Sequence, residues 1–134
     1  HGRVPYVINN LQELGVSIDG ASKETYEKLR LGGRWDKIIE GLECIAEQKQ
    51  KHGFRFILHM VVQQDNWHEL EDMLELGRRY GADRVYFNKM EDWNTNINFD
   101  LQTFTKLEEF KDSLRQVSSD PLSYNNFDHV LNII

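Results

Sequence analysis

Residues 14–20, Leu-Gly-Val-Ser-Ile-Asp-Gly, alternate apolar side chains with small or polar ones. This period of two predicts a β-strand over 14–19 with one buried face. A turn is expected at Gly20, and Ser22 is placed to cap a short helix that runs to Leu29. This stretch therefore predicts a strand, a turn and a helix in succession.

The same strand-then-helix order is repeated further along the chain. The expected elements are helices over 34–51, 66–80 and 101–117 and strands over 54–63 and 84–89. Asn66 and Glu69 resemble a capping box at the start of the middle helix. From Ser118 onward, Pro121 and paired asparagines predict an irregular tail. Residues 1–95 are thus interpreted as three β/α units, and residues 96–134 as a helix and tail that pack on them.

Alternating strands and helices predict an α/β fold with a parallel sheet. One face of each expected strand is apolar and suits a covering layer of helices. The opposite face collects polar side chains, namely Ser17, Asp19, His59, Gln63, Tyr86 and Asn88. A sheet with helices on both faces would favour apolar residues on both, so this pattern favours a barrel or half-barrel with helices on its outer face. Catalytic groups in such folds lie at the carboxyl ends of the strands.

Composition excludes several classes of protein. A complete eight-fold barrel needs about 250 residues, and this chain has 134. The net charge of −6 and the absence of a basic stripe argue against nucleic acid as a partner. No apolar run approaches the roughly 20 residues that span a bilayer, so no membrane association is expected. A single cysteine, Cys44, leaves no disulfide framework and favours a cytoplasmic origin.

The string over 16–27, Val-Ser-Ile-Asp-Gly-Ala-Ser-Lys-Glu-Thr-Tyr-Glu, resembles radical S-adenosylmethionine (radical SAM) enzymes, in the branch related to SPASM and twitch domains. Further pieces continue the resemblance in order, namely 29–30, 32–33, 61–63, Asn66, Glu69, 80–83 and 91–95. Together they cover roughly Leu11 to Thr95.

The resemblance implies the second half of a partial (β/α)6 TIM-like barrel, its fourth to sixth strands. It implies that Ser17 and Asp19 face the methionine and ribose parts of S-adenosylmethionine, and that Arg30 approaches the carboxylate of this cofactor. Gln63 and Asn88, at the next two strand ends, are then expected near the adenine and the substrate.

The chain departs from the family in its cysteines. The three-cysteine CxxxCxxC loop is absent, and Cys44 alone cannot ligate a 4Fe–4S cluster. We therefore expect a fragment of an iron–sulfur oxidoreductase, inactive alone and without catalytic or metal-ligating residues of its own. Its S-adenosylmethionine and 4Fe–4S cluster would belong to the intact parent, and its partner would be the missing N-terminal half of the barrel.

Two other functions are weighed against this one. The chain could be a non-catalytic scaffold or binding module that forms a homodimer or swapped assembly through exposed strand edges. It could also be a metal-dependent enzyme using Asp19, His59 and Glu91, although no ligand spacing supports this. His59, between apolar neighbours, is interpreted as a hydrogen-bonded core histidine. The substrate of the parent enzyme is left open by the sequence.

Overall fold

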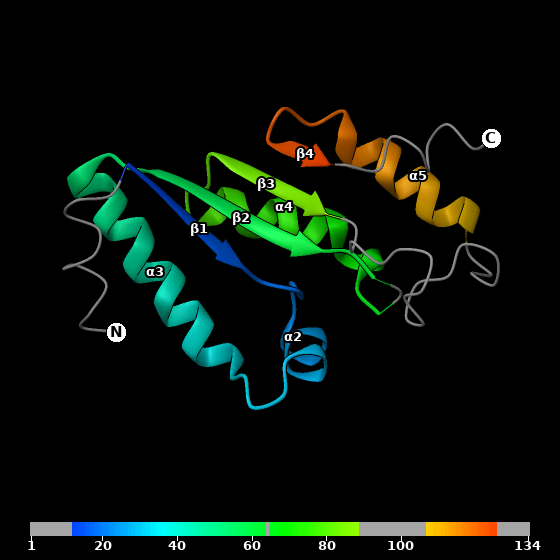
Figure 1. Ribbon diagram of the computed structural model, residues 1–134, viewed down its shortest axis with the longest axis horizontal. Coiled ribbons are helices and arrows are strands. Elements are labelled where there is room, and N and C mark those ends of the chain that lie inside the picture. Colours follow the sequence, from blue (N-terminus) through cyan, green and yellow to red (C-terminus); the bar gives the residue numbers. More distant parts are fainter. Residues whose placement is uncertain (1–11, 64, 89–106, 126–134) are drawn as a thin grey trace.

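The computed structural model describes residues 12–63, 65–88 and 107–125. Within them, four strands form one parallel sheet in the order β1-β2-β3-β4 (Figure 1). Parallel neighbours need crossover connections, and helices lie in sequence between each pair of strands. The prediction of an α/β fold with a parallel sheet is confirmed.

The elements follow the expected order with small shifts at their ends. Their bounds are β1 Glu13–Ser17, α2 Lys23–Leu29, α3 Trp35–His52, β2 Arg55–Val61, the short 3-10 helix η1 Trp67–Glu69, α4 Leu70–Arg79, β3 Arg84–Asn88, α5 Leu107–Ser118 and β4 Ser123–Asn125. β1 and β2 end earlier than the alternation predicts, and side chains bond the backbone beyond Ser17 and Val61, as described below.

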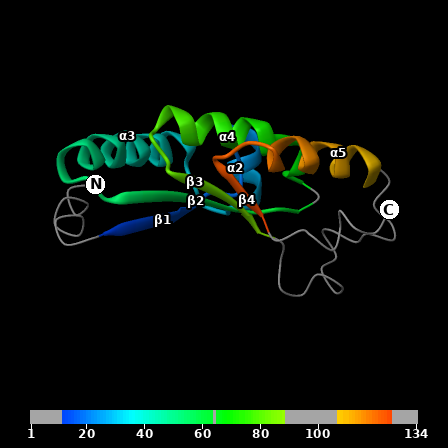
Figure 2. The same ribbon diagram turned by 90° about the horizontal axis from the view of Figure 1, so that it is seen from above.

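The helices lie on one side of the sheet. Figure 2 shows α3, α4 and α5 along the same face, while α2 follows the carboxyl end of β1. The face beneath them is apolar, and Phe56, Leu58 and Phe87 are fully buried there. Phe110 and Leu114 of α5 are fully buried as well. None of the helices described covers the opposite face of the sheet, which we call the open face.

An aromatic contact joins α5 to the segment that follows β2. The ring centroids of Phe110 and Trp67 lie 6.0 Å apart in an edge-to-face arrangement. Trp67 belongs to η1, and aromatic pairs in this geometry stabilise the packing of the elements that carry them. The last helix therefore packs on the same core as the first three strands.

The segment after α5 differs from the irregular tail that its composition indicates. Residues 123–125 form β4, which pairs in parallel with β3 through Val85, Tyr86 and Phe87. A three-residue strand is too short to show a period of two, so only its long-range pairing defines it. β3 is therefore an inner strand of the described sheet, whose outer strands are β1 and β4.

A carboxylate fixes the start of β3 against β2. Asp83 accepts a hydrogen bond of 2.8 Å from the backbone N–H of Phe56, and its other carboxylate oxygen lies within 3.4 Å of the Lys49 ammonium. Burial alone raises the pKa of the Asp83 carboxyl, but the Phe56 N–H and the charges of Lys49 and Arg55 outweigh it. Together they hold this pKa below its ordinary value of 3.8.

Several expectations concern residues outside the described ranges. They are Glu91, the 91–95 piece of the resemblance, the boundary between 95 and 96 and the first six residues of the helix expected over 101–117. Among the described helices, none combines the length and apolar character needed to cross a bilayer.

Candidate functional site

The carboxyl ends of β1, β2 and β3 meet at one edge of the sheet (Figure 1). Asp19 Oδ1 accepts a hydrogen bond of 3.1 Å from the backbone N–H of Val61. The N–H of Val62 in turn donates to the carbonyl of Asn88 at 2.8 Å. Asp19, Val61 and Asn88 therefore lie side by side at the carboxyl ends of three successive strands, where parallel-sheet enzymes carry their sites.

Asn66 ties the segments that leave β1 and β2. Its side chain is fully buried and makes three hydrogen bonds. The amide nitrogen donates to the carbonyls of Asp19 and Val61, both at 2.9 Å, and the amide oxygen accepts from the N–H of Gln63 at 2.7 Å. A buried amide with its bonds satisfied fixes the backbone on both sides of the candidate site.

Glu69 makes a second link between the same two segments. Glu69 is 5% exposed, and its carboxylate accepts a hydrogen bond from the N–H of Ala21 at 2.7 Å. It also accepts from the hydroxyls of Ser22 at 2.6 Å and Thr25 at 2.8 Å. Ser22 remains the N-cap of α2, as predicted, through a 3.4 Å bond from the N–H of Thr25.

The capping-box prediction for Asn66 and Glu69 is wrong. Neither side chain caps η1 or α4. Both are buried and bond groups more than 40 residues away in the sequence, because unsatisfied polar groups in a core are costly and the end of β1 offers partners.

The predicted cofactor-facing residues differ in their surroundings. Ser17 is exposed at the end of β1, while Gln63 and Asn88 are half-buried near the ends of the next two strands. Arg30 is exposed and follows α2, and within the described ranges no hydrogen bond or ion pair joins its side chain to Ser17 or Asp19. The contact of these five residues with a cofactor stays a prediction.

His59 differs from the hydrogen-bonded core histidine that its neighbours indicate. It is half-buried on the open face, and neither ring nitrogen has a hydrogen-bond partner in the described part of the chain. Its ring meets that of Tyr86 edge-on, with centroids 5.1 Å apart. Apolar neighbours in sequence did not reveal this, since residues on either side of a strand residue point to the other face.

The residues present do not fit an iron–sulfur cluster. Such a cluster needs several cysteine thiolates, and the only cysteine of the sequence, Cys44, is half-buried on α3. Among the described residues, no group of three or more His, Cys, Asp or Glu side chains is placed to hold a metal ion. At the carboxyl edge of the sheet Ser17 is exposed and Asp19 Oδ2 has no partner within the described ranges, so both can bond a polar ligand.

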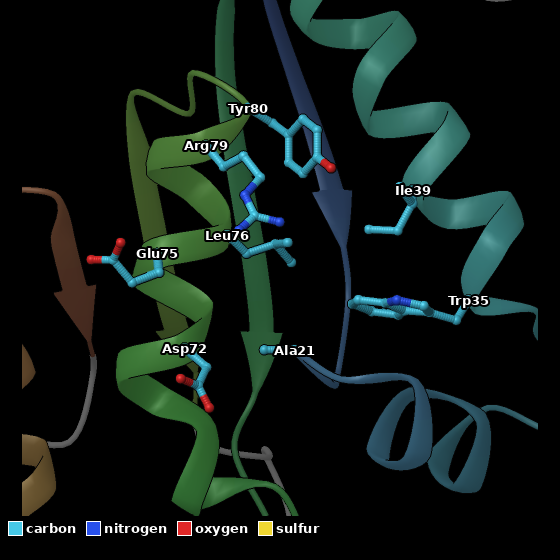
Figure 3. A pocket seen from close by; sticks show the side chains of 8 residues that line it. All are labelled: Ala21, Trp35, Ile39, Asp72, Glu75, Leu76, Arg79 and Tyr80. Atoms are coloured by element: carbon cyan, nitrogen blue, oxygen red, sulfur yellow. The ribbon is translucent and has the colours of Figure 1, made fainter.

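A groove of about 370 Å³ lies on the other side of the molecule, between α3 and α4. Figure 3 shows Trp35 and Ile39 from α3 facing Leu76 of α4 and Tyr80, the residue that follows this helix. Charged side chains, Asp72 and Arg79, border it and are exposed. The sheet separates this groove from the open face, so the groove shares no side chain with the polar residues of that face.

Comparison with known proteins gives one partial similarity. No protein-family model matches the chain. Over 73 residues it is 33% identical to an AdoMet-dependent heme synthase of Methanosarcina barkeri. The match takes in 54% of this chain and 20% of the relative, so the chain spans about a fifth of the length of that protein.

Proposed function

We propose that this chain forms the cofactor-facing half of the barrel of a radical SAM oxidoreductase. The observation that carries the proposal is the gathering of Ser17, Asp19 and Asn88 at the carboxyl edge of a parallel sheet whose open face has no helix over it among the described residues. Similarity to an AdoMet-dependent relative supports the same assignment.

The proposed work of the chain is to bind and orient. S-adenosylmethionine supplies the reactive organic group in this family, and Asp19 would hold its hydroxyl or ammonium groups through the carboxylate oxygen left unpaired. Asn66 and Glu69 would not contact the cofactor but would fix the backbone that carries Asp19. Three further side chains complete the proposed contacts, namely Arg30, Gln63 and Asn88.

The proposal also requires a partner. The cluster-binding cysteines and the first strands of a six-unit barrel would lie on another part of the polypeptide. The outer edge of β1 has no neighbouring strand among the described residues and is where that half would pair.

The test uses the complete gene product that contains these residues. Its coding sequence upstream of His1 should encode a three-cysteine CxxxCxxC loop. After anaerobic reconstitution with iron and sulfide, the protein should cleave S-adenosylmethionine to 5′-deoxyadenosine when reduced. Asp19→Ala should weaken S-adenosylmethionine binding by about tenfold, equal to about 1.4 kcal/mol, whereas Asp36→Ala on the exposed start of α3 should not.

Two results would overturn the proposal. One is a gene product without the cysteine loop, and the other is a reconstituted protein that does not cleave the cofactor. A scaffold module is the second candidate, and the unpaired edge of β1 in the described part of the chain favours it. Self-association of the isolated chain is expected under both candidates, and the scaffold candidate alone predicts that the complete gene product does not bind S-adenosylmethionine, with or without Asp19→Ala.

A further inference from the structure

We propose that the groove between α3 and α4 is a docking site for an amphipathic helix of a partner protein, a helix that carries opposite charges at its two ends. The groove lies on the helical side of the sheet and shares no side chain with the polar residues of the open face. The inference is therefore independent of the proposed function.

The groove follows most of the length of α3. One hollow of about 370 Å³ lies beside Trp35 and Asp72, and a second hollow of about 370 Å³ adjoins it toward Lys49. Arg79 and Tyr80 border both hollows, so the two form one continuous groove. Lys49 follows Trp35 by about 14 residues, which correspond to about 21 Å along a helix. A partner helix of about 14 residues has the same length.

The walls of the groove favour a helix over an extended segment. Both walls are helices, whose interior N–H and carbonyl groups bond each other. An extended peptide in such a groove would find no backbone partners for its own N–H and carbonyl groups, and burying these groups unbonded is costly. A helix bonds its own backbone groups, so it can present apolar side chains to the groove without this cost.

The lining of the groove suits one stripe of apolar side chains. Trp35 and Ile39 of α3 are half-buried and form one side, and the buried side chains of Leu76 and Tyr80 lie opposite them (Figure 3). Side chains three or four residues apart share one face of a helix, and such a stripe inserts into a groove between other elements. A second copy of the same concave groove cannot fill it, whereas the convex stripe of a separate helix can.

The two ends of the groove carry opposite charges. Asp72 lies at the end where Trp35 begins α3, and Arg79 lies beside Tyr80 toward the other end (Figure 3). Both charged side chains are exposed, and neither has a hydrogen bond or an ion pair within the described residues. A helix with a cation at one end and an anion at the other therefore complements both ends at once, because unlike charges attract and like charges repel.

The other charged side chains that border the groove already have partners. Glu75 accepts a hydrogen bond of 2.5 Å from Arg78, and Lys49 forms an ion pair with Asp83. These pairs neutralise each other, so the charges that select a partner are the two unpaired ones.

The experiment titrates the 134-residue chain with three synthetic peptides of about 14 residues. All three share a leucine stripe on an alanine and glutamine background. The first has glutamates at its N-terminus and lysines at its C-terminus, the second has lysines at both ends, and the third has glutamates at both ends. Binding is followed through the indole N–H signal of Trp35 in ¹⁵N-labelled protein, assigned through Trp35→Phe. We expect saturable binding of the first peptide with a Kd below about 1 mM, and binding weaker by about threefold or more for the other two.

Reversal of one charge in the groove tests the complementarity. Asp72→Lys should make the peptide with glutamates at both ends the strongest binder, and Arg79→Glu should do so for the peptide with lysines at both ends, because each substitution turns a repulsion into an attraction. Glu71→Lys is the matched control, since Glu71 is exposed on the same helix and does not border the groove. This variant should keep the order of the wild-type chain. Circular dichroism checks the fold of each variant, and an exchange of preference between peptides does not arise from unfolding.

Three results would overturn the inference. They are an absence of saturable binding of the first peptide, equal binding of all three peptides, and the same change of order in Glu71→Lys as in Asp72→Lys. Self-association of the wild-type chain that is lost in Asp72→Lys, measured by sedimentation velocity, would overturn it as well, because a second copy would then occupy the groove.

Discussion

Glu69 shows at the scale of one residue how the candidate site is held together. A single buried carboxylate accepts hydrogen bonds from one backbone N–H and two hydroxyls, all from the segment that begins α2. Hydrogen bonds to a charged acceptor are stronger than those to a neutral one. The carboxylate therefore fixes the start of α2 relative to η1, and with it the turn that carries Asp19.

Replacing Glu69 with glutamine should lower the free energy of unfolding by about 1–3 kcal/mol, because the charge-assisted bonds become neutral ones. Urea denaturation followed by circular dichroism measures the change. The matched control is Glu71→Gln on the exposed side of α4, where a change within about 0.5 kcal/mol is expected. Equal effects of the two substitutions would contradict the role given to the Glu69 carboxylate.

At the scale of the element, α4 is built to lie close against β3. Gly77 is buried in this helix, and a Cβ atom there would lie 2.7 Å from Cγ2 of Val85. Glycine lowers the stability of a helix. At position 77 this local loss is accepted because a larger residue would prevent α4 from packing closely on β3. Gly41 of α3 has no atom within 4 Å of the same position and meets no such constraint among the described residues.

The two glycines predict opposite results for the same substitution. Gly77→Ala should destabilise the protein by about 1–3 kcal/mol through overpacking against β3. Gly41→Ala should stabilise it by up to about 1 kcal/mol through helix propensity. Thermal and urea denaturation of both variants give the comparison, and a stabilising Gly77→Ala would show that α4 does not approach β3 this closely.

At the scale of the whole molecule, the sheet has a helical side and an open side, and β1 lies at its edge. The N–H of Ile18 donates to the carbonyl of His59, and the carbonyl of Gln12 accepts from the N–H of Arg55. Since the bonding direction alternates along a strand, the N–H of Ser17 points away from β2. This edge offers backbone groups to another chain or another part of the parent.

The chain on its own should therefore associate with itself through β1. Ser17→Pro removes an outward N–H and should shift the population toward monomer, while Ser17→Ala, which keeps that N–H, should not. Sedimentation velocity at several concentrations measures both. A wild-type chain that is monomeric throughout, or equal dissociation by the two variants, would contradict pairing through this edge.

The sequence by itself determined the first three strands, the longer helices and the faces that they bury. Leu14, Val16 and Ile18 repeat every second residue, and the stripe of α3 repeats every three to four, because each pattern is local. From these periods the parallel α/β sheet and its apolar face under the helices follow. The clustering of polar side chains at the carboxyl ends of the strands follows as well, since parallel strands bring these ends to one edge of the sheet.

Only the tertiary structure decided which partners those residues take. β4 forms because residues 123–125 pair with β3. Asn66 and Glu69 link two segments because their side chains bond backbone groups that follow β1. Within the described ranges the imidazole of His59 makes no hydrogen bond, and it lies beside Gly15 and Tyr86 on the open face. Each of these facts depends on contacts between residues far apart in the chain, and a local period carries no information about such contacts.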